Sequence, residues 1–301
     1  MRIKRMFLLL LLSLAFIVAK SLCASPPEEL RIMSYNIFNG FEHGDSLQTD
    51  NFLKFVEAQD PDILALQELV DINAADLVKL AARYGHLYSA TAKEKGYPVG
   101  ITSKFPIEMI HRQVDGYWHG MMHVRIADLD IIVTHLSPFE WKFRLKEAAQ
   151  ILNYIDANSL ADCVIMGDLN AHSPLDGDVL ENHTDLKEQI RKWDIENPQY
   201  GNLRNGNYDY SVISTFMAKG FEDVIGRLVH PSLDRVTFPA AFLYGWEWND
   251  ARLRQKTERL DYILVSENLF PNCISAQVHN GRDAEGISDH YPVSVVMKTK
   301  K

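Results

Sequence analysis

Cysteine is scarce in this sequence. The 301 residues contain three, of which Cys23 lies in the apolar N-terminal region, leaving Cys163 and Cys273. Cys163 falls in an apolar, strand-like run that should be buried, so we expect both residues to remain thiols although export would permit a disulfide. No cluster of cysteine and histidine has the spacing of a zinc site. The composition excludes a disulfide-rich scaffold, and a hydrophobic core of this size needs no such crosslink.

Long hydrophobic runs are confined to the N-terminus. After a basic start (residues 2–5), residues 7–18 are apolar apart from Ser13, and small side chains follow at residues 22–24. This arrangement is typical of a signal peptide, and the run is short for a bilayer span. A retained N-terminal anchor is the alternative. We expect export of the mature protein, with residues 1–24 as signal peptide, residues 25–29 as a short tether and residues 30–301 as one domain.

Positive charge is also in short supply. Lysine and arginine number 31 against 40 aspartates and glutamates, which gives a net charge of −9. Because the leader carries four positive and no negative charges, the mature chain has a net charge of −13. A protein that neutralises many backbone phosphates is usually basic, so this charge argues against tight duplex binding. Hydrolysis of nucleic acid stays open, because a bound divalent metal would supply local positive charge.

Apolar runs of strand length recur along the chain and alternate with stretches of helical periodicity. We expect strands at residues 30–36, 63–67, 99–102, 121–126, 131–134, 164–166, 262–265 and 293–297. We expect helices at residues 50–58, 73–84, from 137 onward and at 210–219. Ser137 should cap the third helix, with Glu140 completing a capping box. Antiparallel neighbours mixed with helical crossovers predict a layered α/β fold rather than a simple doubly wound sheet.

Polar side chains stand where the predicted strands end or begin. In a mixed sheet, the ends of some strands share a rim with the starts of their antiparallel neighbours, so six segments can bring such groups together. Each residue alone has an ordinary explanation, such as a turn, a cap or a solvated strand end. Their joint pattern predicts a site of carboxylate, amide and imidazole groups. The residues are Asn36, Glu68, His135 and Asp168 after apolar runs, and Asp261, Asp289 and His290 before them.

Six segments resemble, in order, the motifs of the endonuclease/exonuclease/phosphatase superfamily. They are residues 34–37 (SYNI), 66–68 (LQE), 133–136 (VTHL), 167–171 (GDLNA), 259–263 (RLDYI) and 288–292 (SDHYP). The similarity covers nearly the whole mature chain. It implies a four-layer α/β sandwich, in which two mixed β-sheets pack face to face with helices outside. It also implies a metal-dependent phosphoric ester hydrolase.

The resemblance assigns a metal site. Glu68 is expected to be the main ligand, with Asn36 and Asp289 nearby. Their oxygen donors suit Mg²⁺, for which Mn²⁺ can substitute, because hard divalent cations prefer carboxylate and amide oxygens. Such a cation neutralises phosphate oxygens and stabilises the leaving group. His119 and His123 surround a strand-like stretch, so we do not expect them to bind metal together.

The resemblance also assigns the catalytic groups. Asp168 is expected to orient or deprotonate the attacking water, and Asn170 to hold a phosphate oxygen or a second ion. His290 is expected to act as general base or charge stabiliser, with its tautomer fixed by Asp261. His135 is expected to bind the phosphate and assist the leaving group.

The sequence leaves the substrate open. We expect an exported Mg²⁺-dependent phosphoesterase, monomeric and without a stable protein partner, that hydrolyses a phosphate mono- or diester. The ester can belong to a phosphorylated small molecule, a lipid head group or nucleic acid. A secreted nuclease and an inactive ligand-binding relative are the alternatives. Two cationic sets are candidate nucleic-acid contacts: Lys142, Arg144 and Lys146, and the run Arg252, Arg254, Lys256 and Arg259. A solvated helix face is the simpler explanation of the first set. Val70 stands where the deoxyribonuclease pattern has arginine. The aromatic segment 238–248 is a candidate substrate loop.

Overall fold

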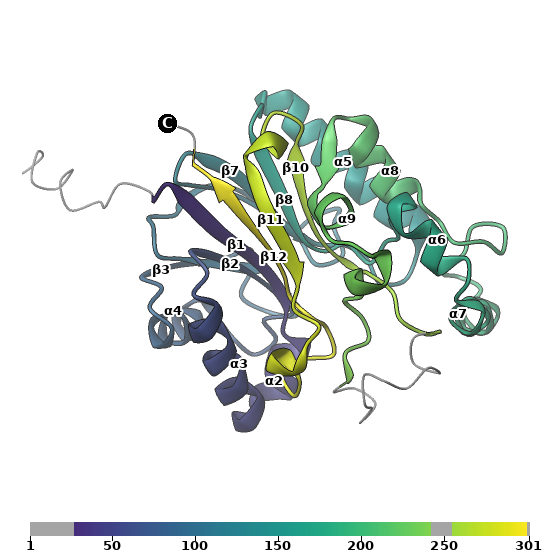
Figure 1. Ribbon diagram of the computed structural model, residues 1–301, viewed down its shortest axis with the longest axis horizontal. Coiled ribbons are helices and arrows are strands. Elements are labelled where there is room, and N and C mark those ends of the chain that lie inside the picture. The colour runs from purple at the N-terminus through teal and green to yellow at the C-terminus, as the bar shows by residue number, and fades with distance from the viewer. Residues whose placement is uncertain (1–26, 242–254, 300–301) are drawn as a thin grey trace, which may run out of the picture.

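The computed structural model describes residues 27–241 and 255–299. Two six-stranded β-sheets pack against each other, with helices on both outer sides (Figure 1), which confirms the predicted four-layer α/β sandwich. The signal peptide, residues 242–248 of the aromatic segment, Arg252 and Arg254 lie outside the described residues. Within the described ranges, we find no helix with the length and apolar character needed to cross a membrane.

The first sheet joins the two ends of the described chain. Its order is β11-β12-β1-β2-β4-β3, in which β1 and β2 are parallel and the other neighbours antiparallel. β12 pairs with β1 along its length, so the last strand of the chain lies beside the first. The strands are β1 (Glu29–Asn36), β2 (Ile63–Gln67), β3 (Tyr88–Thr91), β4 (Gly100–Ser103), β11 (Cys273–Val278) and β12 (Val293–Lys298).

The second sheet is also mixed. Its order is β5-β6-β7-β8-β10-β9, with β7 and β8 parallel and the other neighbours antiparallel. The strands are β5 (Glu108–Gln113), β6 (Met121–Ile126), β7 (Leu129–His135), β8 (Cys163–Asp168), β9 (Phe221–Asp223) and β10 (Asp261–Ser266). The parallel pair in each sheet places the carboxyl ends of β1 and β2, and of β7 and β8, at common edges.

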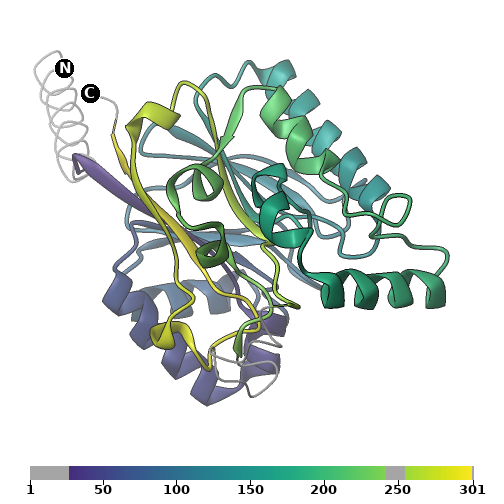
Figure 2. The ribbon, with the colours of Figure 1, turned by 45° about the vertical axis from the view of Figure 1, so that its right-hand side comes forward.

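Helices cover both sheets on the outside, as the view in Figure 2 also shows. On the first sheet, Phe52 of α3 packs with its ring centroid 6.0 Å from that of Tyr35. On the second, α5 and α8 contribute to a hydrophobic cluster with the outward side chains of β7, β8 and β10. The helices are α2 (Phe38–Gly44), α3 (Ser46–Gln59), α4 (Ala74–Arg83), α5 (Trp141–Asn158), α6 (Gly177–Leu180), α7 (Thr184–Glu196), α8 (Ser211–Ala218) and α9 (Val224–Leu228). Short 3₁₀ helices are η1 (Pro174–Asp176), η2 (Ser232–Arg235), η3 (Phe270–Asn272) and η4 (Arg282–Ala284).

Two helix starts differ from their predictions. The helix expected from residue 50 begins at Ser46, where the side chain of Asp45 accepts from the Gln48 amide and caps it. The third expected helix begins at Trp141 rather than near Ser137, and Glu140 precedes it without a side-chain capping bond. The Ser137 hydroxyl accepts a hydrogen bond from the Phe139 amide at 3.3 Å instead, so it stabilises a local turn. Residues 137–140 therefore form a connection beside the strand end at His135, where an early helix would have turned the chain away.

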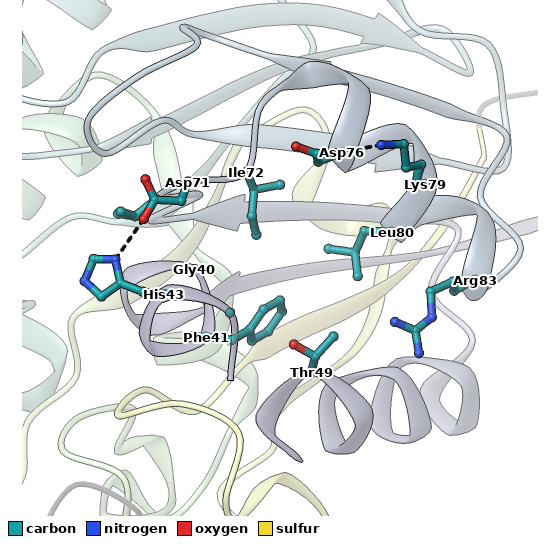
Figure 3. A pocket seen from close by; sticks show the side chains of 12 residues that line it. Gly40, Phe41, His43, Thr49, Asp71, Ile72, Asp76, Lys79, Leu80 and Arg83 are labelled. Carbon is teal, nitrogen blue, oxygen red and sulfur yellow. Dashed lines mark hydrogen bonds and ion pairs between the residues drawn. The ribbon is translucent and has the colours of Figure 1, made fainter. Parts of the chain in front are cut away.

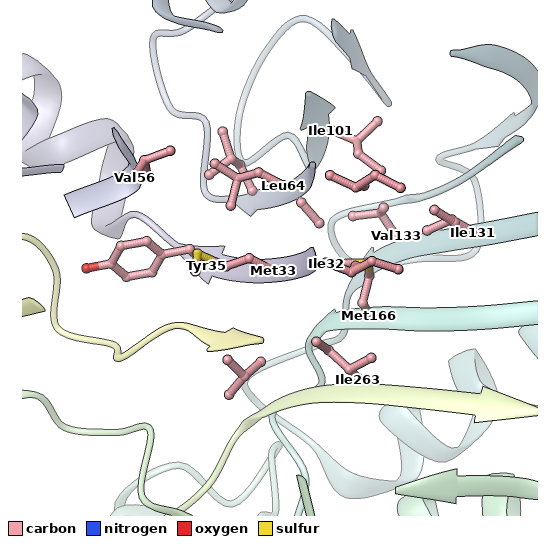
Figure 4. Packing of buried hydrophobic residues seen from close by; sticks show 14 of the residues in the cluster. Ile32, Met33, Tyr35, Val56, Leu64, Ile101, Ile131, Val133, Met166 and Ile263 are labelled. Atoms are coloured by element: carbon pink, nitrogen blue, oxygen red, sulfur yellow. The ribbon is translucent and has the colours of Figure 1, made fainter. Parts of the chain in front are cut away.

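Strand alternation builds the core between the sheets. Successive side chains of a strand point to opposite faces, and one set on each central strand is apolar and fully buried. Figure 4 shows Ile32 of β1 with Val133 of β7 and Met166 of β8 in this cluster. Counting in steps of two along the same faces leads to Asn36, His135, Asp168 and Asp261. The apolar pattern that packs the sheets together thus directs four polar side chains inward at one rim.

Candidate active site

Asp168 lies at the centre of the polar rim. It ends β8, pairs in register with His135 of the parallel neighbour and with Asp261 of the antiparallel neighbour, and is 1% exposed. Its Oδ2 accepts a hydrogen bond from Asn36 Nδ2 at 3.0 Å. The same oxygen lies 3.4 Å from His135 Nε2 and 3.7 Å from His290 Nε2. One carboxylate oxygen is therefore surrounded by polar groups from both sheets.

Asn170 belongs to the turn that follows β8. Its backbone N–H donates to Asp168 Oδ1 at 2.9 Å, and its side-chain Nδ2 donates to the Leu136 carbonyl at 3.1 Å. Asn170 adopts a φ of +47°, a left-handed conformation that asparagine tolerates better than most residues. The turn fixes the second oxygen of Asp168 and ties it to the end of β7.

Asn36 connects Asp168 to the predicted metal ligand Glu68. Its Nδ2 also donates to Glu68 Oε1 at 3.2 Å, while its Oδ1 accepts from the Phe38 amide at 3.1 Å. The other oxygen of Glu68 accepts from the Asn39 amide at 2.8 Å. The backbone donor at Phe38 fixes which end of the amide carries oxygen. Asn36 thus holds both carboxylates through its N–H₂ group.

Asp261 and His290 form a buried pair. His290 Nδ1 lies 2.8 Å from Asp261 Oδ2, which places a proton on Nδ1 and directs Nε2 toward Asp168. Burial alone would lower the pKa of His290, but the surrounding carboxylates, Asp261 first among them, hold that pKa well above its ordinary value. The arrangement has the geometry of an imidazole oriented and charged by a carboxylate.

Asp289 lies next to this pair. Burial raises the pKa of Asp289 to about 6, and the negative charge of Glu68 adds to the effect, so these two carboxylates are neighbours. Ser288 donates to the Asn36 carbonyl at 2.7 Å and lies 3.3 Å from Asp289 Oδ1. The segment therefore attaches directly to the end of β1.

The acidic groups fit a divalent cation. Burial raises the pKa of Asp168 to about 8 against the opposing charge of His290, as expected where buried carboxylates crowd together. Among the described residues, neither Glu68 nor Asp289 forms an ion pair with lysine or arginine. Asp168, Asp261 and His290 also present ligand atoms within 4.8 Å of one another. Asp261 and His290 already bond each other, so we favour Glu68 and Asp289 as the hard oxygen ligands that Mg²⁺ requires.

His135 stacks on His119, which is not among the predicted site residues. The rings of His119 and His135 are 4.0 Å apart at 23°, and neither His119 Nε2 nor His135 Nδ1 has a hydrogen-bond partner among the described residues. Burial lowers the pKa of His119 to about 3 and, with His119 nearby, that of His135 well below its ordinary value. Both rings are therefore neutral. His119 precedes the apolar run of β6, the same signal that identified Asp261.

Two buried side chains of α5, Glu147 and Arg144, hold the connection after His135. Glu147 of α5 accepts from the Ser137 amide at 2.8 Å and from the Trp118 amide at 2.7 Å, while Arg144 donates to the Ser137 carbonyl at 2.9 Å. Arg144 is 4% exposed, so the prediction that it contacts nucleic acid from the rim is wrong. It packs inward because its guanidinium meets Ser137 and Asn202. The position of Arg144 and Glu147 on the apolar face of the predicted helix was the sequence signal that both side chains are buried.

Arg259 anchors the start of β10 in a second buried network. It is 3% exposed, so the prediction that it contacts nucleic acid is wrong. It donates to both oxygens of Asp223, at 2.8 and 2.6 Å, and to Asp176 at 2.8 Å. Arg235 donates to the other oxygen of Asp176 at 3.0 Å. Because Arg259 is two residues from Asp261, this network fixes where β10 enters the site.

A pocket of about 350 Å³ lies on the helix side of the first sheet. Figure 3 shows Phe41, Ile72 and Leu80 around it, with the His43–Asp71 pair beside them. Val70 also lines this apolar wall, which accounts for an aliphatic residue where the deoxyribonuclease pattern has arginine. None of the predicted site residues is among its described lining residues, so we treat it as separate from the rim.

Comparison with known proteins agrees with this fold. The family model described as "Endonuclease/Exonuclease/phosphatase family" matches residues 33–290. The chain therefore belongs to the endonuclease/exonuclease/phosphatase family, whose members hydrolyse phosphoester bonds and depend on divalent metal. All eight predicted site residues fall inside the matched range.

Individual relatives are more distant. A DNA-(apurinic or apyrimidinic site) endonuclease of Dictyostelium discoideum is 26% identical over 279 residues, which cover 89% of this chain and 71% of that protein. An AP endonuclease from Archaeoglobus fulgidus superposes with a TM-score of 0.66 at 20% identity, over 89% of this chain and 99% of its own. A 3'-5' exonuclease, NExo, from Neisseria meningitidis gives 0.65 at 18% identity, over 89% and 100%. These two structures establish the shared fold.

Proposed function

We propose that the chain is an exported, Mg²⁺-dependent phosphoesterase that hydrolyses a phosphodiester of nucleic acid by attack of water. The observation that supports it most directly is the position of Asp168 Oδ2, which lies 3.0 Å from Asn36 Nδ2, 3.4 Å from His135 Nε2 and 3.7 Å from His290 Nε2. A water molecule beside this oxygen would meet a proton acceptor and two imidazoles at once.

Asp168 and His290 both act at the position of the attacking water. The carboxylate of Asp168 orients the nucleophile and accepts its proton, as a general base within hydrogen-bond reach can. His290 directs Nε2 to the same place because Asp261 holds its Nδ1. The charge on His290 then stabilises the anionic phosphate.

His135 and Asn170 face the substrate from the other side. His135 is neutral, and its Nδ1 has no partner among the described residues. In the tautomer with its proton on Nδ1, this nitrogen can donate to a phosphate or leaving oxygen, and Nε2 can accept from the water beside Asp168. Asn170 lies in the adjoining turn, where its amide can bind another phosphate oxygen. Both residues orient the ester for attack from the side of Asp168.

Glu68 and Asp289 would hold the cation, with Asn36 beside them. When bound, Mg²⁺ neutralises charge on the phosphate and stabilises the leaving oxygen. All of the predicted ligand and water-activating residues are present, which disfavours the inactive-relative alternative. The relative named as a DNA-(apurinic or apyrimidinic site) endonuclease supports nucleic acid over a lipid head group.

Hydrolysis of bis-p-nitrophenyl phosphate by the mature protein tests the chemistry. Activity should require added Mg²⁺ or Mn²⁺ and disappear on chelation. Glu68→Gln should raise the metal concentration needed for half-maximal rate, and Asp168→Ala should lower kcat roughly 10²–10⁴-fold. Glu57→Gln, an exposed glutamate of α3, is the matched control. Wild-type rates in Asp168→Ala would refute the proposed role.

Export is tested separately by expression of the full chain. N-terminal sequencing of protein recovered outside the cytoplasm should show a mature end close to residue 25. Recovery of the protein with Met1 retained in the membrane fraction would instead establish an N-terminal anchor.

A further inference from the structure

Five aromatic side chains form a continuous surface next to the site. Trp118 lies between β5 and β6. Phe139 precedes α5, and Phe143 lies in its first turn. Trp193 lies on α7, and Tyr200 follows that helix. Trp118 is 41% exposed, and the other four are half-buried. We call this set the aromatic platform. Fully buried aromatics are ordinary core residues, but a connected set that is partly exposed can mark a binding surface.

Three of its rings share one orientation. Phe139, Trp193 and Tyr200 have interplanar angles of 20–30°. Their centroids are 5.0, 6.1 and 6.3 Å apart. A single stacked column would make the longest distance equal to the sum of the other two, and it does not. The rings therefore form a compact, near-parallel cluster in which each is offset from the other two, with Trp118 packed edge-on against Phe139 at 5.0 Å.

The platform is a built structure rather than a set of loose side chains. Asp194 accepts hydrogen bonds from the amides of Asn202 and Leu203, both at 2.9 Å, which folds the segment carrying Tyr200 back onto α7. The Trp141 amide donates to the Gly201 carbonyl at 2.9 Å, which brings Phe139 beside Tyr200. Each ring is thus fixed by backbone contacts.

The platform is continuous with the proposed active site. Trp118 is followed by His119, whose ring stacks on His135 at 4.0 Å. Phe139 follows His135 by four residues, along the connection that Glu147 and Arg144 hold in place. The aromatic platform and His135 are thus joined through two short segments, residues 118–119 and 135–139.

Cations border the same surface. Lys146 Nζ lies 5.6 Å from the Phe143 ring, and Lys142 Nζ lies 5.7 Å from the Trp141 ring. Neither lysine pairs with a carboxylate within the described ranges, so both charges are available to an anion. Flat rings interleaved with free cations are the combination that binds single-stranded nucleic acid, because bases stack on the rings and phosphates meet the cations.

We infer that the aromatic platform binds unpaired bases of a single-stranded nucleic acid whose phosphodiester lies in the site at Asp168. The inference deepens and rests on the proposed function. A duplex hides its base faces within the stack, so this surface selects an unpaired strand. Binding by stacking also suits a chain with a net charge of −9, which cannot rely on broad phosphate neutralisation.

Binding to a labelled oligothymidylate of about ten nucleotides, a usual single-strand site size, tests the inference. The protein carries Asp168→Asn to prevent turnover, and Mg²⁺ is present. The comparison ligand is an oligomer of the same length with abasic sugars, which keeps the phosphates and removes the bases. Oligothymidylate should bind at least about tenfold more tightly, since one stacked base contributes roughly 5- to 150-fold.

Platform variants give the second measurement. In the same background, Trp193→Ala and Tyr200→Ala should each weaken oligothymidylate binding within that range and leave abasic binding unchanged. Tyr200→Phe should retain binding because it keeps the ring. Tyr88→Ala, a 38% exposed ring on β3, is the matched control.

Two results would overturn the inference. One is equal affinity for the oligothymidylate and the abasic oligomer. The other is loss of binding to phosphatidylcholine vesicles in Trp193→Ala with oligothymidylate binding intact, which would assign the rings to a lipid surface. Base-dependent binding without any hydrolysis of bis-p-nitrophenyl phosphate by the wild type would refute the proposed function alone. Hydrolysis with base-independent binding would refute the platform alone.

Discussion

Asn36 and Asp168, 132 residues apart in the chain, are joined across the two sheets by a hydrogen bond of 3.0 Å from Nδ2 to Oδ2. The same N–H₂ group reaches Glu68 Oε1 at 3.2 Å. One amide therefore links the carboxylate expected to activate water to the carboxylate expected to hold the metal. This gives Asn36 a positioning role that a ligand assignment alone does not describe.

Asn36→Ala should lower kcat/KM on bis-p-nitrophenyl phosphate and raise the Mg²⁺ concentration for half-maximal activity, each by roughly 10–100-fold, the usual cost of losing an outer-shell contact. The reason is that Glu68 and Asp168 lose their shared donor and repel each other. Steady-state kinetics across a Mg²⁺ titration provides the measurement. Asn158→Ala, at the exposed end of α5, is the control. An unchanged Mg²⁺ requirement would contradict the linking role.

Asp261 and His290 should act as one unit. His290→Ala should reduce kcat roughly 10²–10⁴-fold, and Asp261→Asn should also reduce it, since the tautomer and charge of His290 depend on Asp261. The double variant should be no slower than His290→Ala, because groups that act together are not additive. A double-mutant cycle on kcat measures this. If the loss of kcat in the double variant equalled the product of the two single losses, the two residues would act independently.

Arg259 should be a large determinant of stability. In Arg259→Ala, the fully buried carboxylate of Asp223 loses its bidentate partner, and breaking such a pair costs about 3–5 kcal/mol. Urea denaturation measures the change in the free energy of unfolding. Arg227→Ala removes a half-exposed pair with Glu222 and should cost less than about 1 kcal/mol. Equal losses of unfolding free energy in the two variants would show that the buried network stabilises the fold no more than an exposed ion pair does.

Glu147 should make stability depend on pH. Burial raises the pKa of Glu147 from 4.5 to about 7 in the folded protein. The folded state then binds a proton more tightly than the unfolded state, so this contribution is full below the unfolded pKa and is lost as pH rises through about 7. The wild-type free energy of unfolding, minus that of Glu147→Gln, should fall by about 3 kcal/mol over this range.

The control for Glu147 is Glu57→Gln, which removes an exposed carboxyl from α3. Urea denaturation of all three proteins at several pH values separates the local effect from titration elsewhere. A constant difference between wild type and Glu147→Gln would show that Glu147 stays ionised throughout, held by the amides of Trp118 and Ser137.

The strand ends were predictable because the signal is local. Continuous apolar runs predict the buried strands, and these runs stop at Asn36, His135 and Asp168. The helix near residue 137 was misplaced because its start depends on a distant contact. Ser137 is held by Glu147 and Arg144, so it cannot cap the helix.

By itself, the sequence determined the central strands of the fold and which polar residues end or begin them, because both follow from apolar runs of a few residues. The arrangement in two mixed sheets was implied by the family resemblance, and the strands β3, β5, β9 and β11 were not predicted. Tertiary structure alone decided that His119 stacks on His135, that Arg144 turns inward, and that Phe139 and Tyr200 share a surface. These relationships join segments whose approach is set by the packing of whole sheets and helices, and no local pattern encodes that geometry.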